Sequence, residues 1–141
     1  MIDMNKSQLL IFLERHRYGV LSSLSPSKTP QSALVGIAAT PDFEIIFDTV
    51  KSSRKYPNLI ANPQCSFVIG WDNEQTLQFE GIAREPAGQE LKRYQQIYFT
   101  AWPECRSHLT WPGIACFVIR PTWLRYSDFN QSPPQIVELS F

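Results

Sequence analysis

Four consecutive residues near the middle of the chain, Ser52-Ser53-Arg54-Lys55, combine side-chain types that bind phosphate. They begin a predicted short helix, with the serines as possible N-caps and the two cations in the first turn. Cations are unfavourable at a helix N-terminus, which carries a partial positive charge. A bound anion reverses that sign, because backbone N–H groups, hydroxyls, guanidinium and ammonium then converge on one phosphate-sized site. The segment predicts a phosphate-binding cradle; the alternative is that Arg54 and Lys55 are solvated surface charges.

Motifs for several other chemistries are missing from the sequence. It has no GxGxxG fingerprint, no Walker A loop and no G-x-S-x-G elbow. His16 and His108 lack metal-ligand spacing, so no metal site is predicted; His16 is expected to face solvent, and His108 lies in a polar loop. Glu80 follows Phe79 in an alternating strand and is expected to be solvent-facing or ion-paired. Because no catalytic residue can be assigned, a chain that binds phosphate is expected to use a cofactor.

Length and composition are those of one small soluble domain. The chain has 141 residues, 13 Lys and Arg against 13 Asp and Glu, and 43% hydrophobic residues. This predicts a single domain over 1–141 and indicates neither a nucleic-acid nor a membrane partner. Residues 1–6 lack the apolar region of a signal peptide, so a cytoplasmic location is expected. Three cysteines without CxxC spacing indicate neither disulfides nor zinc, and Cys65 and Cys116 are expected to be buried thiols.

Hydrophobic periodicity predicts three helices and a series of strands. Asn5 and Gln8 form an expected capping box at the first helix, and Asn62-Pro63 ends the second. Short connections between the strands favour antiparallel hairpins. The pattern predicts a mainly β, α+β fold, a small antiparallel β-barrel with peripheral helices. The predicted helices are 5–16, 53–61 and 87–99, and the predicted strands are 18–24, 31–39, 43–48, 65–71, 76–84, 114–119 and 123–126, with 136–139 able to pair at an edge.

The chemical motifs follow one another in a distinctive order. Phe47-Asp48-Thr49 ends a strand, Ser53-Arg54-Lys55 begins a short helix, Asn62-Pro63 ends it, and an apolar strand then leads to Trp71 and to a strand ending Gly81-Ile82-Ala83. Over roughly residues 5–128 this order resembles the pyridoxamine 5'-phosphate oxidase-like family of flavin-binding split barrels. The resemblance implies a six-stranded antiparallel split β-barrel that forms a homodimer. It also implies FMN bound in two equivalent clefts at the dimer interface.

The resemblance further implies which residues bind the cofactor. The Arg-Lys pair would hold the FMN phosphate, the second strand would run beneath the isoalloxazine, and one hairpin would come from the other subunit. Trp111 would either cover the ring or pack at the interface, whereas Trp71 and Trp123 are expected in the core. Gly36 would be small to allow close backbone approach to the ring, although a bulge explains it equally well. Together with Ser53 of the cradle, the implied residues are Arg54, Lys55, Thr49, Ala33, Leu34, Val35, Gly36, Gln75, Thr76 and Trp111.

The sequence departs from the family enzymes where they bind a second phosphate. The corresponding regions read Ala33-Leu34-Val35-Gly36-Ile37-Ala38 and Tyr98-Phe99-Thr100-Ala101-Trp102-Pro103, which leaves Tyr98 as a substrate contact. Arg125 is the nearest equivalent of the enzymes' basic C-terminal finish. We therefore expect an FMN-dependent oxidoreductase whose small-molecule substrate or electron donor stays open. The alternatives are a non-catalytic flavin-binding or sensing protein, a deazaflavin-dependent reductase and an empty scaffold. Haem is disfavoured because neither histidine lies where a strand would present it.

Overall fold

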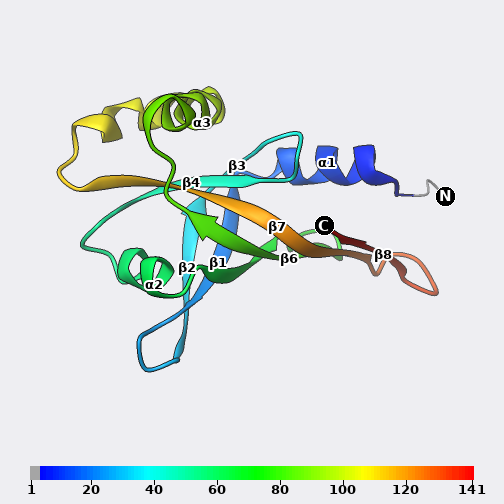
Figure 1. Cartoon of the computed structure of the whole chain (residues 1–141). Helices are drawn as coiled ribbons and strands as arrows, with labels where there is room; N and C mark the ends of the chain where they lie inside the picture. The colour runs from blue at the N-terminus through cyan, green and yellow to red at the C-terminus, as the bar shows by residue number, and fades with distance from the viewer. Residues whose placement is uncertain (1–3) are drawn as a thin grey trace.

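The computed structural model describes residues 4–141, which form a curled antiparallel sheet with helices packed around it (Figure 1). Residues 1–3, the start of the N-terminal segment considered above, lie outside the described residues. Within residues 4–141, no helix combines the length and apolar character needed to cross a membrane. The mainly β, α+β fold expected from the sequence is confirmed.

The predicted helices and strands are present, with shifted bounds. His108, expected in a polar loop, lies in a 3₁₀ helix over residues 103–110. The strand expected at 43–48 begins later because residues 40–44 form a turn in which Phe43 has a φ of 62°. The elements are α1 (Lys6–Arg15), β1 (Tyr18–Leu24), β2 (Pro30–Gly36), β3 (Ala38–Ala39), β4 (Ile45–Val50), α2 (Lys55–Ala61), β5 (Gln64–Ile69), β6 (Gln75–Arg84), α3 (Gly88–Ala101), η1 (Pro103–Thr110), β7 (Ile114–Asp128) and β8 (Gln135–Ser140).

The sheet has the strand order β2-β1-β5-β6-β7-β4-β3, and every pair is antiparallel. The predicted strand 31–39 is divided into β2 and β3, which lie at the two ends of this order. The C-terminal segment pairs with β7 as β8, so the edge pairing expected for 136–139 is confirmed. Figure 1 shows α3 on the side of β4 and β7, and α2 close to β1 and β2.

β7 is one continuous strand of 15 residues where the sequence predicted two. Its first part pairs with β4 as far as Ile119, and its last part pairs with β8 from Trp123 onwards. Pro121 lies on β7 between the part that pairs with β4 and the part that pairs with β8. It is opposite Gly81, where the register with β6 shifts. Proline has no N–H to donate, so it is tolerated at such an interruption. A β-carbon on Gly81 would lie 2.5 Å from the Arg120 carbonyl oxygen, so the close approach requires glycine.

Two apolar clusters stabilise the fold. The larger one fills the inside of the curled sheet, and the smaller one lies between α3, η1 and the strands β3, β4 and β7. Cys65 and Cys116 are buried free thiols, as expected. Trp71 was expected in the core but is 55% exposed in the single chain, and Trp123 is half-buried. The strand before Trp71 ends at Ile69, so the indole has left the alternating pattern that would direct it inward.

The first helix begins as the sequence predicts. Asn5 and Gln8 form the capping box, each side chain bonding the other's backbone N–H at 2.9 Å. His16 follows the helix, where solvent exposure was expected. Its ring is instead half-buried against Phe12, and Nδ1 lies 2.7 Å from the Phe12 carbonyl oxygen. The expectation of a solvent-facing histidine is therefore wrong.

Candidate functional site

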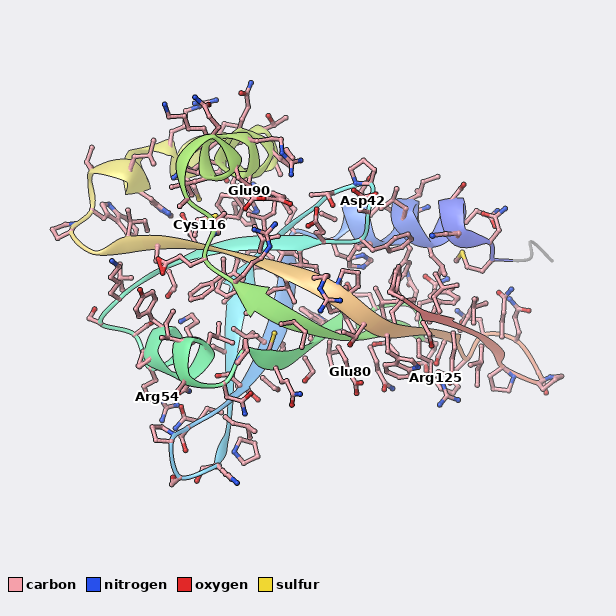
Figure 2. All side chains as sticks on the ribbon, in the orientation of Figure 1. Asp42, Arg54, Glu80, Glu90, Cys116 and Arg125 are labelled. Carbon is pink, nitrogen blue, oxygen red and sulfur yellow. The ribbon has the colours of Figure 1, made fainter. Side chains whose placement is uncertain are left out.

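The cradle lies where β4 leads into α2. Arg54 is the N-cap residue and Lys55 is the first helical residue (Figure 2 labels Arg54 beside α2). Neither serine caps the helix, so that part of the prediction is wrong. The Ser53 hydroxyl lies 2.9 Å from Thr49 Oγ1 at the end of β4, and this hydrogen bond turns it away from the helix N–H groups. Ser53, directly before the two cations, is thus in contact with Thr49 at the end of β4.

Arg54 and Lys55 line a cavity of about 90 Å³ together with Ala33 and residues from β1 and β2. Lys55 is half-buried, and this burial lowers the pKa of its ammonium group. Within residues 4–141, no ion pair involves either cation. An ammonium that is partly desolvated and unpaired is costly, and an anion in the cavity would relieve that cost.

Asn58 fixes the cradle to the sheet. Its side chain is buried and donates from Nδ2 to Gln31 Oε1 at 2.9 Å and to Ser23 Oγ at 3.2 Å. These bonds join α2 to β2 and β1, beside the cavity that the two cations line. In the sequence, Asn58 occurs within the motif, but nothing in its spacing identifies these partners.

The four residues of the predicted ring floor do not face one surface. Ala33 lines the cradle cavity, Leu34 is 62% exposed on the opposite face, and Val35 is buried in the core, as alternation in a strand requires. Gly36 lies against Trp102, and the approach is so close that a β-carbon added to Gly36 would be 2.8 Å from the indole Cζ2. The close neighbour of Gly36 is therefore an indole of the same chain, held by a 2.9 Å bond from Trp102 Nε1 to the Ile37 carbonyl oxygen.

The remaining predicted residues lie elsewhere in the chain. Gln75 and Thr76 begin β6, and Gln75 lines a separate cavity of about 450 Å³ with residues of α1 and β7. Trp111 directly follows η1, is 48% exposed, and stacks on His108 with ring centroids 3.8 Å apart. The single chain therefore brings together Ala33, Arg54 and Lys55 but not Gln75.

A polar cluster that the sequence did not predict lies under α3. His108 Nδ1 is 2.9 Å from Asp48 Oδ2, and the two side chains are 19% and 14% exposed. The Tyr98 hydroxyl lies 3.4 Å from Asp48 Oδ1 and 3.3 Å from the Gly36 carbonyl oxygen, so its one hydrogen is shared between two acceptors. Asp48 and His108 are 60 residues apart in the chain, and no local spacing indicates that they meet.

The neighbours of this cluster hold their protons at neutral pH. Burial raises the pKa of Tyr98, and the nearby Asp48 carboxylate adds to the effect. Burial also raises the pKa of the Cys116 thiol to about 12 and raises that of Cys105. Figure 2 shows Cys116 on β7 beneath α3. Beside the cluster, Asp48, Tyr98 and Cys116 line a cavity of about 80 Å³ with apolar residues of α3 and β7.

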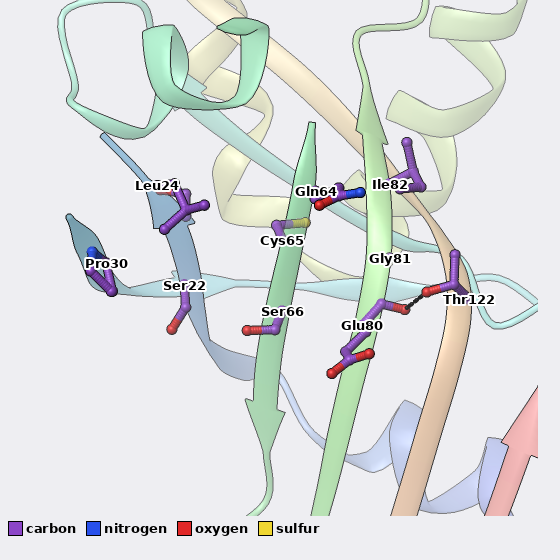
Figure 3. Close-up of a pocket in the computed structure, with 11 residues that line it drawn as sticks. Ser22, Leu24, Pro30, Gln64, Cys65, Ser66, Glu80, Gly81, Ile82 and Thr122 are labelled. Carbon is purple, nitrogen blue, oxygen red and sulfur yellow. Dashed lines mark hydrogen bonds between the residues drawn. The ribbon is translucent and has the colours of Figure 1, made fainter. Parts of the chain in front are cut away.

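A wide cavity of about 540 Å³ lies on the outer face of the sheet and contains no predicted site residue. Figure 3 shows Ser22, Ser66 and Glu80 there on neighbouring strands, with Thr122 donating at 3.1 Å to the Glu80 carbonyl oxygen. The Glu80 side chain is exposed, which confirms the solvent-facing alternative.

Solved structures share this fold. A haem-binding protein from Mycobacterium smegmatis matches with a TM-score of 0.83 at 14% identity, covering 99% of this chain and 60% of its own. The haem storage protein HutZ from Vibrio cholerae matches with a TM-score of 0.74 at 14% identity, covering 85% of this chain and 91% of its own. A pyridoxamine 5'-phosphate oxidase-related, FMN-binding protein from Nostoc punctiforme matches with a TM-score of 0.71 at 12% identity, covering 96% and 95%.

The chain thus spans about three fifths of the M. smegmatis protein. The comparison with curated proteins gave no match. The family model described as pyridoxamine 5'-phosphate oxidase matches residues 6–128, which include both the cradle and the cluster under α3. With this match over most of its length, the chain belongs to the pyridoxamine 5'-phosphate oxidase family.

Proposed function

We propose that the protein is an FMN-binding oxidoreductase, a cytoplasmic homodimer with the flavin at its interface. The substrate or electron donor is a small molecule. The observation that carries the proposal is the cradle, in which Lys55 is partly desolvated and, among residues 4–141, neither Arg54 nor Lys55 has an ion-pair partner. A bound phosphate offsets the cost of that arrangement and makes charge-assisted hydrogen bonds with both cations.

The residues of the cradle fit a phosphate monoester. The guanidinium and ammonium are donors of the right charge, and the hydroxyl of Ser53, which directly precedes them in the chain, contacts that of Thr49. The cavity of about 90 Å³ is too small for a tricyclic ring, so the rest of the cofactor has to extend along β2. When bound, FMN supplies hydride or electron transfer, while the protein binds and orients it.

Haem is the second candidate, because two of the similar structures are a haem-binding and a haem storage protein. His16 directs Nδ1 at the Phe12 carbonyl oxygen, and His108 directs Nδ1 at Asp48. Neither histidine lies on a strand. A histidine ligand for iron would therefore be Nε2 of His16 or of His108, whereas the cradle has no role in holding iron.

A titration of the cofactor-free protein with FMN tests the proposal. We expect saturable binding at one FMN per subunit, with riboflavin, which lacks the phosphate, binding at least about 100-fold more weakly. Replacing both cations in the Arg54→Ala/Lys55→Ala variant should weaken FMN binding by a similar factor. It should leave the fold intact, because these side chains contribute to neither apolar cluster.

Lys51→Ala is the matched control, since Lys51 is an exposed cation close in sequence that lies outside the cavity. It should bind FMN like the wild type. Equal binding of FMN and riboflavin, or full FMN affinity in the double variant, would contradict the cradle. Parallel titrations with haem and with a deazaflavin test whether the protein binds one of these cofactors in place of FMN. Bound FMN that no electron donor can reduce would favour the non-catalytic alternative.

A further inference from the structure

The Asp48–His108 pair has the geometry of a proton-exchanging group. Asp48 Oδ2 lies 2.9 Å from Nδ1, and an ionised carboxylate only accepts, so Nδ1 is the nitrogen that donates. The hydrogen bond therefore occupies Nδ1 and leaves Nε2 as the ring nitrogen that can face a bound substrate. No described residue bonds Nε2.

Two further contacts hold this pair in one orientation. Trp111 stacks on the imidazole with its ring plane 27° from that of His108. The Tyr98 hydroxyl approaches the second carboxylate oxygen of Asp48, at 3.4 Å. With both carboxylate oxygens and one face of the imidazole in contact, the direction of Nε2 is fixed.

The groups around the pair do not compete with it for protons. Three groups approach Asp48: Tyr98 from α3, Cys105 from η1 and Cys116 from β7. The pKa of each is raised, so all three are neutral at physiological pH. Asp48, from β4, is the anion that His108 contacts. Glu85 also lines the cavity beside Asp48 and Tyr98, and His108 is the side chain of the cluster whose second ring nitrogen is free of a described partner.

β2 links the pair to the cradle. Ala33 lines the cradle cavity, and the Gly36 carbonyl oxygen contacts Tyr98. The two residues are three strand positions apart, a distance of about 10 Å. A ligand whose phosphate is held by Arg54 and Lys55, and that extends along β2 toward Gly36, would approach Tyr98, which also contacts Asp48.

We propose that His108 is the proton-exchanging residue for a substrate that binds beside the flavin, and that Asp48 and Tyr98 position it. The assignment rests on the proposed function. In the step, the reduced flavin would supply a hydride and the imidazolium would give its Nε2 proton to a substrate heteroatom, which together account for the two electrons and two protons that the substrate gains. The neutral imidazole keeps its Nδ1–H bonded to Asp48, and solvent returns the proton to Nε2. The exposed face of Trp111 favours a planar acceptor, such as a quinone, which must take up a proton when it is reduced.

The test uses photoreduced FMN-loaded protein mixed with menadione, with flavin reoxidation followed from about pH 5 to 8. His108→Gln should slow the reaction on the order of 100-fold and remove its pH dependence. Asp48→Asn and Tyr98→Phe should slow it less and alter the pH profile. FMN affinity should be unchanged in all three variants. His16→Gln is the matched control, because His16 is the other of the chain's two histidines. This variant should behave like the wild type.

A second measurement does not depend on FMN. In the cofactor-free protein, diethyl pyrocarbonate should modify His108 faster than His16, and Asp48→Asn should slow that modification. If His108 reacts no faster than His16, the assignment is overturned. It is also overturned if His108→Gln binds FMN and keeps the wild-type rate and pH profile. A wild-type protein that binds no FMN but shows fast, Asp48-dependent modification would refute the proposed function and leave the proton-exchanging histidine supported.

Discussion

At the scale of single residues, Lys55 makes the cofactor-free protein sensitive to pH. Burial lowers the pKa of this ammonium below its ordinary value of 10.5, so the folded state binds its proton less tightly than the unfolded state does. Between the folded and unfolded pKa values the unfolded chain carries more protons, and stability therefore rises with pH in that window. At pH values below both pKa values the full penalty is present.

Lys55→Met removes this penalty. We expect the free energy of unfolding of the cofactor-free variant to exceed that of the wild type at neutral pH. The rise in stability toward pH 10.5, the ordinary value for lysine, should disappear. Urea denaturation at a series of pH values measures both effects. Lys51→Met should change neither, and saturating FMN should reverse the order, because only the wild type keeps the ammonium that binds phosphate.

Single residues also show where sequence reasoning ends. The cradle is local, so consecutive serine, arginine and lysine residues were enough to suggest it, and Arg54 and Lys55 do line one cavity. The contact between His108 and Asp48 depends on how η1 folds back over β4, and no spacing in the sequence indicates that. Gly36 was predicted to be small for a flat ring, and the neighbour that requires it to be small is Trp102 of the same chain.

At the scale of elements, α2 depends on tertiary contacts. It has seven residues and no side-chain N-cap, so its intrinsic stability is low. The buried Asn58 supplies two hydrogen bonds to the strands beside it, and Leu59 packs into the core. The position of the two cations therefore depends on how firmly Asn58 attaches the helix to the sheet.

Asn58→Ala should lower the free energy of unfolding by about 1–3 kcal/mol, because Gln31 loses its buried donor. It should also weaken FMN binding about tenfold, a loss of about 1.4 kcal/mol, since part of the binding free energy is then used to reposition α2. Chemical denaturation and the FMN titration measure the two effects. Gln96→Ala, an exposed amide on α3, should change neither, and unchanged FMN affinity in the Asn58 variant would show that α2 is positioned by other contacts.

Element types were predictable because periodicity and turn residues are local signals. Their bounds were not, since β7 continues through Pro121 only because its partner changes from β4 to β8 at that point. The division of 31–39 into β2 and β3 likewise follows from the curl of the sheet, which places its two parts at opposite ends of the strand order.

At the scale of the whole molecule, the proposed cofactor site is divided between subunits. Gln75 lines a different cavity from that of Arg54 and Lys55, so the single chain does not bring these predicted contacts together. In the proposed homodimer, the cradle of one subunit faces Gln75 and Thr76 of the other.

Mixing two defective variants tests this division. Arg54→Ala/Lys55→Ala subunits and Gln75→Ala/Thr76→Ala subunits should each bind FMN poorly as homodimers. After they are mixed under conditions that exchange subunits, each mixed dimer should regain one wild-type site, which FMN fluorescence titration would count. If both sets of residues act within one subunit, no mixed dimer regains a site. Size-exclusion chromatography with light scattering checks that the dimers form.

The pairing of β4 with β7 also determines the order in which the protein matures during synthesis. Thr49, at the start of the cradle, pairs with Ala115, and β4 has no other long partner among residues 4–141. While the ribosome is still translating α3, the segment that leads into Arg54 therefore has no sheet to join. A nascent chain lacking β7 holds α2 through its contacts with β1 and β2, without the strand that pairs with the segment leading into Arg54. We therefore expect cofactor capture to be completed only after β7 has emerged from the ribosome.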